Sequence, residues 1–321
     1  MVSAIAGVSV GHWTDAVAGT GCTVVIPPAG TVAGLEVRGG GPATRDVEIL
    51  GPLASAQSIT ALVFSGGSAF GLDTASGVAR WCEERGMGHD TGAARVPIVP
   101  TACIYDLGVT GGGCRPGADE GYAACEAARP GPHAVGSVGA GTGATCGKLR
   151  AQDGWCKGGL GAGSRRLHDG TSVAALAVVN AWGDVLEPTG EVLAGAFHPE
   201  RGFVGAADRV IDSHPVHPRL AAAESTTLAC IVTDARLTKV EATIVARMAH
   251  AGMARAVSPV HTPLDGDIAF CLATGARPAS ALACGVAAAA ALADAIRDAV
   301  RSATSVRGVP TAAERRAGAP R

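Results

Sequence analysis

Apolar residues form short uninterrupted runs along the chain, and each run predicts a strand buried on both faces. Five such segments are Gly21–Ile26, Ile59–Ser65, Ser172–Asn180, Thr226–Thr233 and Asp267–Ala273. They are rich in Val, Ile, Leu, Ala and Thr, and Gly, Pro or Asp residues lie close to their ends. This combination is typical of strands in the interior of a layered protein.

Three longer segments have the periodicity of helices: Ala69–Arg85, Thr238–Ala256 and Ser280–Val300. The second begins with Thr238 and Glu241, which have the spacing of a capping box. Every third or fourth residue of this helix is apolar, which predicts a stripe facing the core. The stripe consists of Val240, Ile244, Met248 and Ala251.

Two further segments predict strands of a less regular kind. Val96–Tyr105 is apolar but contains two Pro residues, which favours an edge strand or a strand with a bend. Ser172–Asn180 and Asp184–Glu187 flank the tripeptide Ala-Trp-Gly, and this arrangement predicts a hairpin. Strands and helices therefore mix without strict alternation, which favours a layered α+β sandwich over a doubly wound sheet.

The remaining segments are poor in periodic pattern. Residues 107–170 are rich in Gly and predict loops, and residues 201–220 contain two His-Pro steps typical of a surface connection. Residues 301–321 carry five Arg against one Glu, together with Pro and Gly, which predicts a disordered tail. We therefore expect one domain over residues 1–300.

Composition and charge exclude several classes of protein. Gly and Pro together number 64 of 321 residues, but 47% of the chain is hydrophobic and no G-X-Y period occurs, so neither collagen nor bulk disorder fits. The net charge of −2 and 3% aromatic residues argue against a nucleic-acid partner. The longest uncharged apolar run, 278–293, is too short to span a membrane, and the first residues resemble no export signal. We expect a cytoplasmic protein that binds no membrane.

The cysteines and glycine-rich loops offer no sign of a metal or cofactor. The ten Cys include no C-x-x-C pair and read as reduced, structural thiols. The segment Val138–Lys148 resembles a phosphate-binding loop, but Thr142 stands where such a loop needs Gly, and Leu149 supplies no hydroxyl for magnesium. We therefore expect neither a cofactor nor a metal site.

A few polar residues stand out against this background. Lys148 follows ten small residues, so it is either a solvated charge or a buried ammonium with a role. Asp265 and Asp267 flank Gly266, which fits an ordinary turn or a carboxylate pair that orients a base. No GxSxG motif is present and the nine His are scattered, so a Ser-His-Asp triad has no anchor.

Thr226 opens a predicted buried strand, and two interpretations are open for it. Thr simply favours strands. Alternatively, an internal Thr can attack the preceding carbonyl in an N→O acyl shift, and hydrolysis of the ester leaves Thr at a new N-terminus. Its α-amine, with a pKa near 7.7–8.0, could then act as base for its own hydroxyl.

Taken together, these segments resemble the P1 peptidases, also called family S58. This family includes L-aminopeptidase/D-esterases, β-peptidyl aminopeptidases and nylon-oligomer hydrolases. The resemblance covers about residues 5–275. It rests on GVSVGHWTD, VRGGGPATR, VFSGGSAFGLDTASGVARWCEERG, VPIVPTACIYDL, VGAGTGATCGK, GGLGAGS, VVNAWGDV, TTLACIVTDA and HTPLDGDIAF.

The resemblance implies a four-layer α-β-β-α sandwich, like that of N-terminal-nucleophile hydrolases but differently connected. It implies a precursor that cuts itself at Ser225–Thr226 into a large chain, 1–225, and a small chain, 226–321. Cytoplasmic homo-oligomers, tetramers by expectation, would hydrolyse small peptides or amides, including β-peptides, D-amino-acid esters or nylon oligomers.

The resemblance also assigns roles to residues of this chain. Thr226 falls on the nucleophile and Lys148 on a lysine near it. Asn180 falls on a candidate oxyanion donor, and Tyr105 is expected to line the site. The remaining pair, Asp265 and Asp267, would orient the Thr amine and Lys148.

Two departures from the family pattern bear on this expectation. Ser225 replaces the Asn common before the cut, and Ile268 replaces the Thr usual after Asp-Gly-Asp. The acyl shift needs only a carbonyl at 225, so Ser is chemically admissible. Two alternatives stay open: an acyltransferase that uses the same acyl-enzyme, and an uncleaved binding protein with the same fold.

Overall fold

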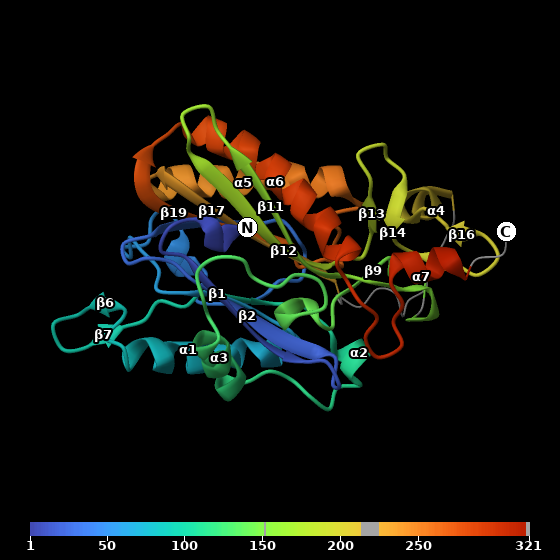
Figure 1. The fold of residues 1–321 in the computed structure, drawn as a ribbon, viewed down its shortest axis with the longest axis horizontal. Helices are drawn as coiled ribbons and strands as arrows, with labels where there is room; N and C mark the ends of the chain where they lie inside the picture. The colour runs from blue at the N-terminus through green and yellow to red at the C-terminus, as the bar shows by residue number, and fades with distance from the viewer. Residues whose placement is uncertain (151, 213–224, 319–321) are drawn as a thin grey trace.

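The computed structural model describes residues 1–150, 152–212 and 225–318, and its framework is two five-stranded sheets stacked between helices (Figure 1). The first sheet has the order β1-β2-β5-β8-β4 and the second the order β11-β12-β17-β19-β3. Within the second sheet β17 and β19 are parallel, and the other pairs are antiparallel. The first sheet's strands are Ser9–Asp15, Thr20–Ile26, Leu62–Ser65, Thr101–Cys103 and Ala43–Arg45; the second sheet's are Gly159–Arg166, Ser172–Asn180, Thr226–Arg236, Ile268–Pro278 and Val32–Val37.

Helices α1 (Thr74–Glu83) and α3 (Ala118–Glu126) cover the outer face of the first sheet, and α5 (Lys239–Ala256) and α6 (Ala281–Arg301) cover that of the second (Figure 1). Three separate groups of buried apolar residues fill the spaces between these four layers. The four-layer α-β-β-α sandwich expected from the sequence is confirmed.

Shorter elements connect the layers and edges. The strands among them are β6 (His89–Asp90), β7 (Arg95–Val96), β9 (Thr145–Cys146), β10 (Cys156–Lys157), β13 (Asp184–Leu186), β14 (Val192–Ala194), β15 (Phe197–His198), β16 (Gly202–Phe203) and β18 (Val257–Ser258). The helices are α2 (Leu107–Thr110), α4 (Ala206–Asp212) and α7 (Ala312–Ala317), with 3-10 turns at Val2–Ala4, Glu48–Leu50, Ser68–Asp73, Gly139–Gly141 and Gln152–Gly154. Among the described helices, none is both long and apolar enough to cross a lipid bilayer.

The two faces of the second sheet carry side chains of different size. On β19 the face toward the first sheet presents Ile268, Phe270 and Leu272. The face toward the helices presents the smaller Ala269, Cys271 and Ala273. Small residues allow α6 to approach β11 closely: a Cβ at Gly161 would lie 2.1 Å from the carbonyl oxygen of Ala295. The glycine-rich segment that predicted a loop is therefore the strand β11, because only Gly admits the helix backbone at this distance.

The capping box of α5 is confirmed, but the predicted core-facing stripe of this helix is wrong. Thr238 Oγ1 accepts the Glu241 N–H, as expected. Val240 and Ile244 are 55% and 43% exposed, and the buried face carries mostly small residues. The reason is the close approach of α5 to β3 and α6, since large side chains would hold these elements apart.

The predicted hairpin is also wrong. β12 pairs with β11 and β17, whereas β13 pairs with β14 and β18 in a separate sheet. The tripeptide at 181–183 instead makes contacts elsewhere, because the Trp182 carbonyl accepts the Lys148 N–H and the Trp182 N–H reaches Asp265.

The two Pro residues of Val96–Tyr105 precede the strand rather than interrupt it. β8 begins after Pro100 and lies between β5 and β4, so it is not an edge strand. The helix predicted at Ala69 starts as a 3-10 turn, Ser68–Asp73, and becomes α-helical at Thr74. Within the predicted surface connection 201–220, residues 206–212 form α4, and 213–220 lie outside the described residues.

The described part of the predicted tail, up to residue 318, is ordered. Thr311 caps the short helix α7, and its Arg side chains bind main-chain carbonyls. The Arg315 guanidinium donates to the Trp155 carbonyl at 2.8 Å, and Arg316 donates to the Leu193 carbonyl at 2.7 Å. The Arg-rich composition therefore serves docking against the body of the protein.

Candidate active site

The ends of three inner strands of the second sheet, β12, β17 and β19, meet at one end of that sheet. Asn180 is the last residue of β12 and lies opposite Thr226, the first residue of β17. Asp267 directly precedes β19, which runs parallel to β17. The polar residues 180, 226 and 267 are therefore neighbours because of the sheet register, although they are far apart in sequence.

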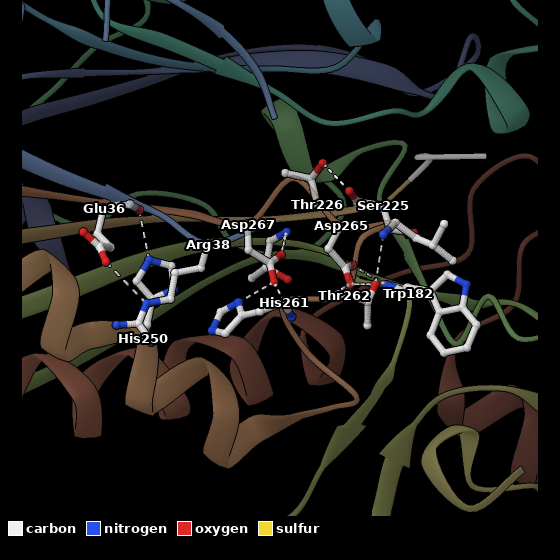
Figure 2. Close-up of polar contacts among 12 residues, drawn as sticks. Glu36, Arg38, Trp182, Ser225, Thr226, His250, His261, Thr262, Asp265 and Asp267 are labelled. Carbon is white, nitrogen blue, oxygen red and sulfur yellow. Dashed lines mark hydrogen bonds and ion pairs between the residues drawn. The ribbon is translucent and has the colours of Figure 1, made fainter. Parts of the chain in front are cut away.

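The main chain at Ser225 and Thr226 lies against the Asp-Gly-Asp segment. Ser225 forms a parallel bridge with Asp265, and the Gly266 N–H donates to the Ser225 carbonyl at 2.8 Å. The Thr226 hydroxyl donates to the same carbonyl at 2.5 Å (Figure 2). One carbonyl oxygen thus accepts two hydrogen bonds, and all of these groups are buried.

The Asp265 carboxylate is buried and fully engaged. Its Oδ1 accepts the Trp182 N–H at 3.1 Å, and its Oδ2 accepts the N–H and hydroxyl of Thr262 at 3.2 and 2.5 Å (Figure 2). Burial, together with the charge of nearby Asp267, raises the pKa of Asp265 above its ordinary value. The pair therefore resists carrying two full negative charges.

Asp267 joins β17 to a histidine. Its Oδ1 accepts the Thr227 N–H at 2.7 Å. Its Oδ2 accepts the His261 main-chain N–H at 3.0 Å and the ring Nδ1–H at 2.8 Å (Figure 2). The carboxylate is only 1% exposed, so these three donors account for its stabilisation by the described residues.

Lys148 and Asn180 form the other side of the site. Lys148 Nζ donates to Asn180 Oδ1 at 2.9 Å and to the Asn180 carbonyl at 3.2 Å. Asn180 Oδ1 also accepts the Thr145 N–H at 3.1 Å, and Nδ2 donates to the Tyr105 carbonyl at 3.1 Å. Lys148 is therefore a buried ammonium, 4% exposed, and not a solvated charge.

The site residues expected from the sequence are thus joined by one continuous set of contacts. Trp182 links the two sides, since its N–H binds Asp265 and its carbonyl binds the Lys148 N–H. This set places a hydroxyl, a carbonyl, a lysine, an amide and two carboxylates in a buried region, and a nucleophilic hydroxyl near hydrogen-bond donors is an arrangement that acyl transfer can use. The expected residues joined in this way are Tyr105, Lys148, Asn180, Ser225, Thr226, Asp265 and Asp267.

Sequence reasoning missed the histidines of this region. His250 and His261 are separated along the chain, but their rings meet edge to face with centroids 4.8 Å apart. The fold also brings His12 and His133 to 6.2 Å. The available signal for the site was the position of His261 and Thr262, four and three residues before Asp265 of the Asp-Gly-Asp motif.

The cysteines are free, and nine of the ten are buried. Burial raises the pKa of several, for example Cys82 to about 11, so they stay protonated thiols near neutral pH. Among the described residues, no three His, Cys, Asp or Glu side chains converge as metal ligands.

The layered fold is shared with solved aminopeptidases. A β-aminopeptidase from Burkholderia sp. superposes with a TM-score of 0.70 and 23% identity, over 99% of this chain and 92% of that one. An L-aminopeptidase D-Ala-esterase/amidase from Ochrobactrum anthropi, described as a variant of the Ntn-hydrolase fold, gives 0.72 and 18%, over the same shares. The chain has the fold of these Ntn-type hydrolases.

Sequence comparison assigns the chain to one family of peptidases. The model of peptidase family S58 matches residues 1–313, and the chain belongs to this family. An uncharacterized aminopeptidase of Mycobacterium tuberculosis is 42% identical over 293 residues, 86% of this chain and 81% of the relative. A 6-aminohexanoate-oligomer endohydrolase of Paenarthrobacter ureafaciens is 32% identical over 283 residues, 84% and 73% respectively. The protein is a hydrolase of peptide or amide bonds.

Proposed function

We propose that the chain cleaves itself between Ser225 and Thr226, and that Thr226 then serves as the N-terminal nucleophile of an amide hydrolase. The substrates are small peptides or amides with a free amino end. The observation that carries this proposal is the geometry at the bond to be cut. The Thr226 hydroxyl lies beside the Ser225 carbonyl, and the Gly266 N–H donates to that carbonyl oxygen.

Self-cleavage follows from these contacts in two balanced steps. Thr226 Oγ1 adds to the Ser225 carbonyl carbon, and the Gly266 N–H stabilises the negative oxygen that forms. The C–N bond breaks, the hydroxyl proton passes to the new amine, and an ester joins Ser225 to Thr226 Oγ1. Water then hydrolyses the ester, which leaves a carboxylate at Ser225 and a free amine on Thr226.

The same residue then acts on substrates. The Thr226 amine, with an ordinary pKa near 7.7–8.0, takes the proton of its own hydroxyl during attack. The Asn180 amide, held by Lys148, supports the oxyanion. Departure of the amine product leaves an acyl ester on Thr226, and water releases the acid and restores the hydroxyl.

Ser225 in place of Asn is compatible with this chemistry. The step uses the main-chain carbonyl of residue 225, and among the described residues the Ser225 hydroxyl has no hydrogen-bond partner. The names of the relatives support the substrate class, because they include an aminopeptidase, a β-aminopeptidase and a hydrolase of 6-aminohexanoate oligomers.

The test compares the intact masses of the purified protein and its Thr226→Ala variant under denaturing conditions. We expect the unaltered chain to give fragments of about 22 and 10 kDa, by proportion of its 31.7 kDa, with the smaller beginning at Thr226. Thr226→Ala removes the attacking oxygen, so it should stay a single chain and lose activity by at least about 10⁴-fold.

Thr226→Ser is the matched control, since it keeps the hydroxyl and should still cleave. Activity is read as release of p-nitroaniline from α- and β-aminoacyl p-nitroanilides and of monomer from 6-aminohexanoate dimer. A Thr226→Ala variant that is cut at 225 and remains active would overturn the assignment.

A further inference from the structure

His261 has an unusual backbone conformation for a residue that is not Gly. Its φ of +57° lies in the left-handed region, where a side chain costs conformational energy. In this conformation its main-chain N–H and its ring Nδ1 bind the same oxygen, Oδ2 of Asp267, at 3.0 and 2.8 Å. A strained residue with two donors on one carboxylate oxygen points to a role at the site.

The other oxygen of Asp267 extends this contact to the bond to be cut. Asp267 Oδ1 accepts the N–H of Thr227, the residue after the nucleophile, at 2.7 Å. His261 thus supplies two of the three donors that the described residues offer to this buried carboxylate. These three donors hold the carboxylate of Asp267 in place between β17 and the segment that contains His261.

A second histidine holds the ring of His261 in place. His250 packs against it edge to face, and His250 Nε2 donates to the Glu36 carbonyl at 2.9 Å (Figure 2). Burial lowers the pKa of His250 to about 4, so this ring is neutral near pH 7. The hydrogen bond to Asp267 fixes the His261 tautomer that carries the proton on Nδ1.

We propose that His261 is a positioning residue for the Thr226 nucleophile. Through Asp267 it fixes the main chain at Thr227, and it thereby holds the Thr226 hydroxyl beside the carbonyl that it attacks. This inference rests on the function proposed for Thr226. It assigns a role to a side chain that does not itself touch the reacting atoms.

Three variants separate the hydrogen bond from the backbone strain. His261→Asn keeps a donor at the place of Nδ1 and tolerates positive φ. His261→Gly tolerates positive φ but has no side-chain donor. His261→Ala has no side-chain donor and does not tolerate positive φ well. His89→Gly, at an exposed position on β6, is the matched control for loss of a histidine.

The measurements are the first-order rate of cleavage at 225–226, followed by intact mass during cell-free synthesis, and kcat and KM of the matured enzyme for an aminoacyl p-nitroanilide. We expect His261→Asn and His89→Gly to stay within about threefold of the unaltered chain. His261→Gly should slow cleavage and lower kcat by roughly 10- to 100-fold with little change in KM, because misplacement affects attack more than binding. His261→Gly should melt at a lower temperature than His261→Asn, because it loses a buried hydrogen bond and gains entropy in the unfolded chain, so both rates are measured well below its melting temperature.

Two outcomes would overturn the proposal. His261→Gly could cleave and turn over as fast as the unaltered chain, or His261→Asn could fold normally and be as slow as His261→Gly. Failure of the underlying function has a different signature. An unaltered chain that persists as a single mass would reject the proposed nucleophile, and with it this role for His261.

Discussion

Two buried lysines show how different surroundings give one residue type different roles. Lys148 binds the side-chain oxygen and carbonyl of Asn180, which lies opposite Thr226 in the second sheet. Lys157 lies deeper, and its ammonium donates to the carbonyls of Gly141, Ala144 and Gly158 at 2.9, 2.8 and 3.4 Å. Both are almost completely buried.

The partners, and not the burial, distinguish a site from a structural feature. Two of its acceptors, Gly141 and Ala144, belong to one loop and the third is the adjacent Gly158, so Lys157 holds that loop beside β10. Lys148 instead holds an amide whose orientation matters for the proposed chemistry. Burial lowers the pKa of Lys157 to about 7, although it has no part in the site, so a perturbed pKa by itself does not locate function.

Among variants of these two lysines, we expect the largest effect, a loss of catalytic efficiency, from Lys148→Met. Loss of the charged donor to Asn180 should lower kcat/KM by roughly 10²- to 10³-fold, equivalent to about 3–4 kcal/mol of transition-state stabilisation. The unfolding free energy should change less. Kinetics with an aminoacyl p-nitroanilide and urea denaturation measure the two quantities, and Lys157→Met is the control. Normal kinetics in Lys148→Met would remove Lys148 from the mechanism.

A smaller effect, on stability, is expected from Lys157→Met. This change removes the lysine donor from three buried carbonyls, of which Ala144 keeps the Gly158 N–H, and it should cost about 1–3 kcal/mol of unfolding free energy at pH 7. The kcat of the matured enzyme should stay within about threefold, since Lys157 does not contact the site residues described above. Urea denaturation measures the loss. An unchanged midpoint would show that this loop does not need the ammonium.

The smallest expected effect is a pH dependence of the unfolding free energy that Lys157→Met costs. The pKa of Lys157 is about 7 in the folded chain and 10.5 ordinarily, so above pH 7 the unfolded chain binds more protons than the folded one. The folded form with lysine therefore gains stability as pH rises, by up to about 1.4 kcal/mol per pH unit. The cost of Lys157→Met should be larger at pH 8 than at pH 7. A constant difference would contradict the lowered pKa.

The apolar runs and the helix-capping residues were sufficient to predict those strands and helices that depend mainly on nearby residues. The strands at Thr226 and Ser172 are apolar on both faces because both faces are covered, and Thr238 begins a helix because its side chain caps it. The prediction that Val240 and Ile244 face the core was wrong, because the packing of α5 favours small residues over large ones. The prediction of a hairpin was wrong because Trp182, between the two strands, binds groups that lie far away in sequence.

For the candidate site too, some features were predictable from the sequence and others were not. The residue types of acyl-transfer chemistry at Lys148, Asn180, Thr226 and the Asp-Gly-Asp motif are present in the linear chain, as is membership of the S58 family. Sequence alone could not place His250 against His261, or the Gly266 N–H on the Ser225 carbonyl. Those contacts depend on the register of β12, β17 and β19, which follows from how the sheets and helices pack. Local residue chemistry thus determined which groups are available, and tertiary packing decided which of them meet.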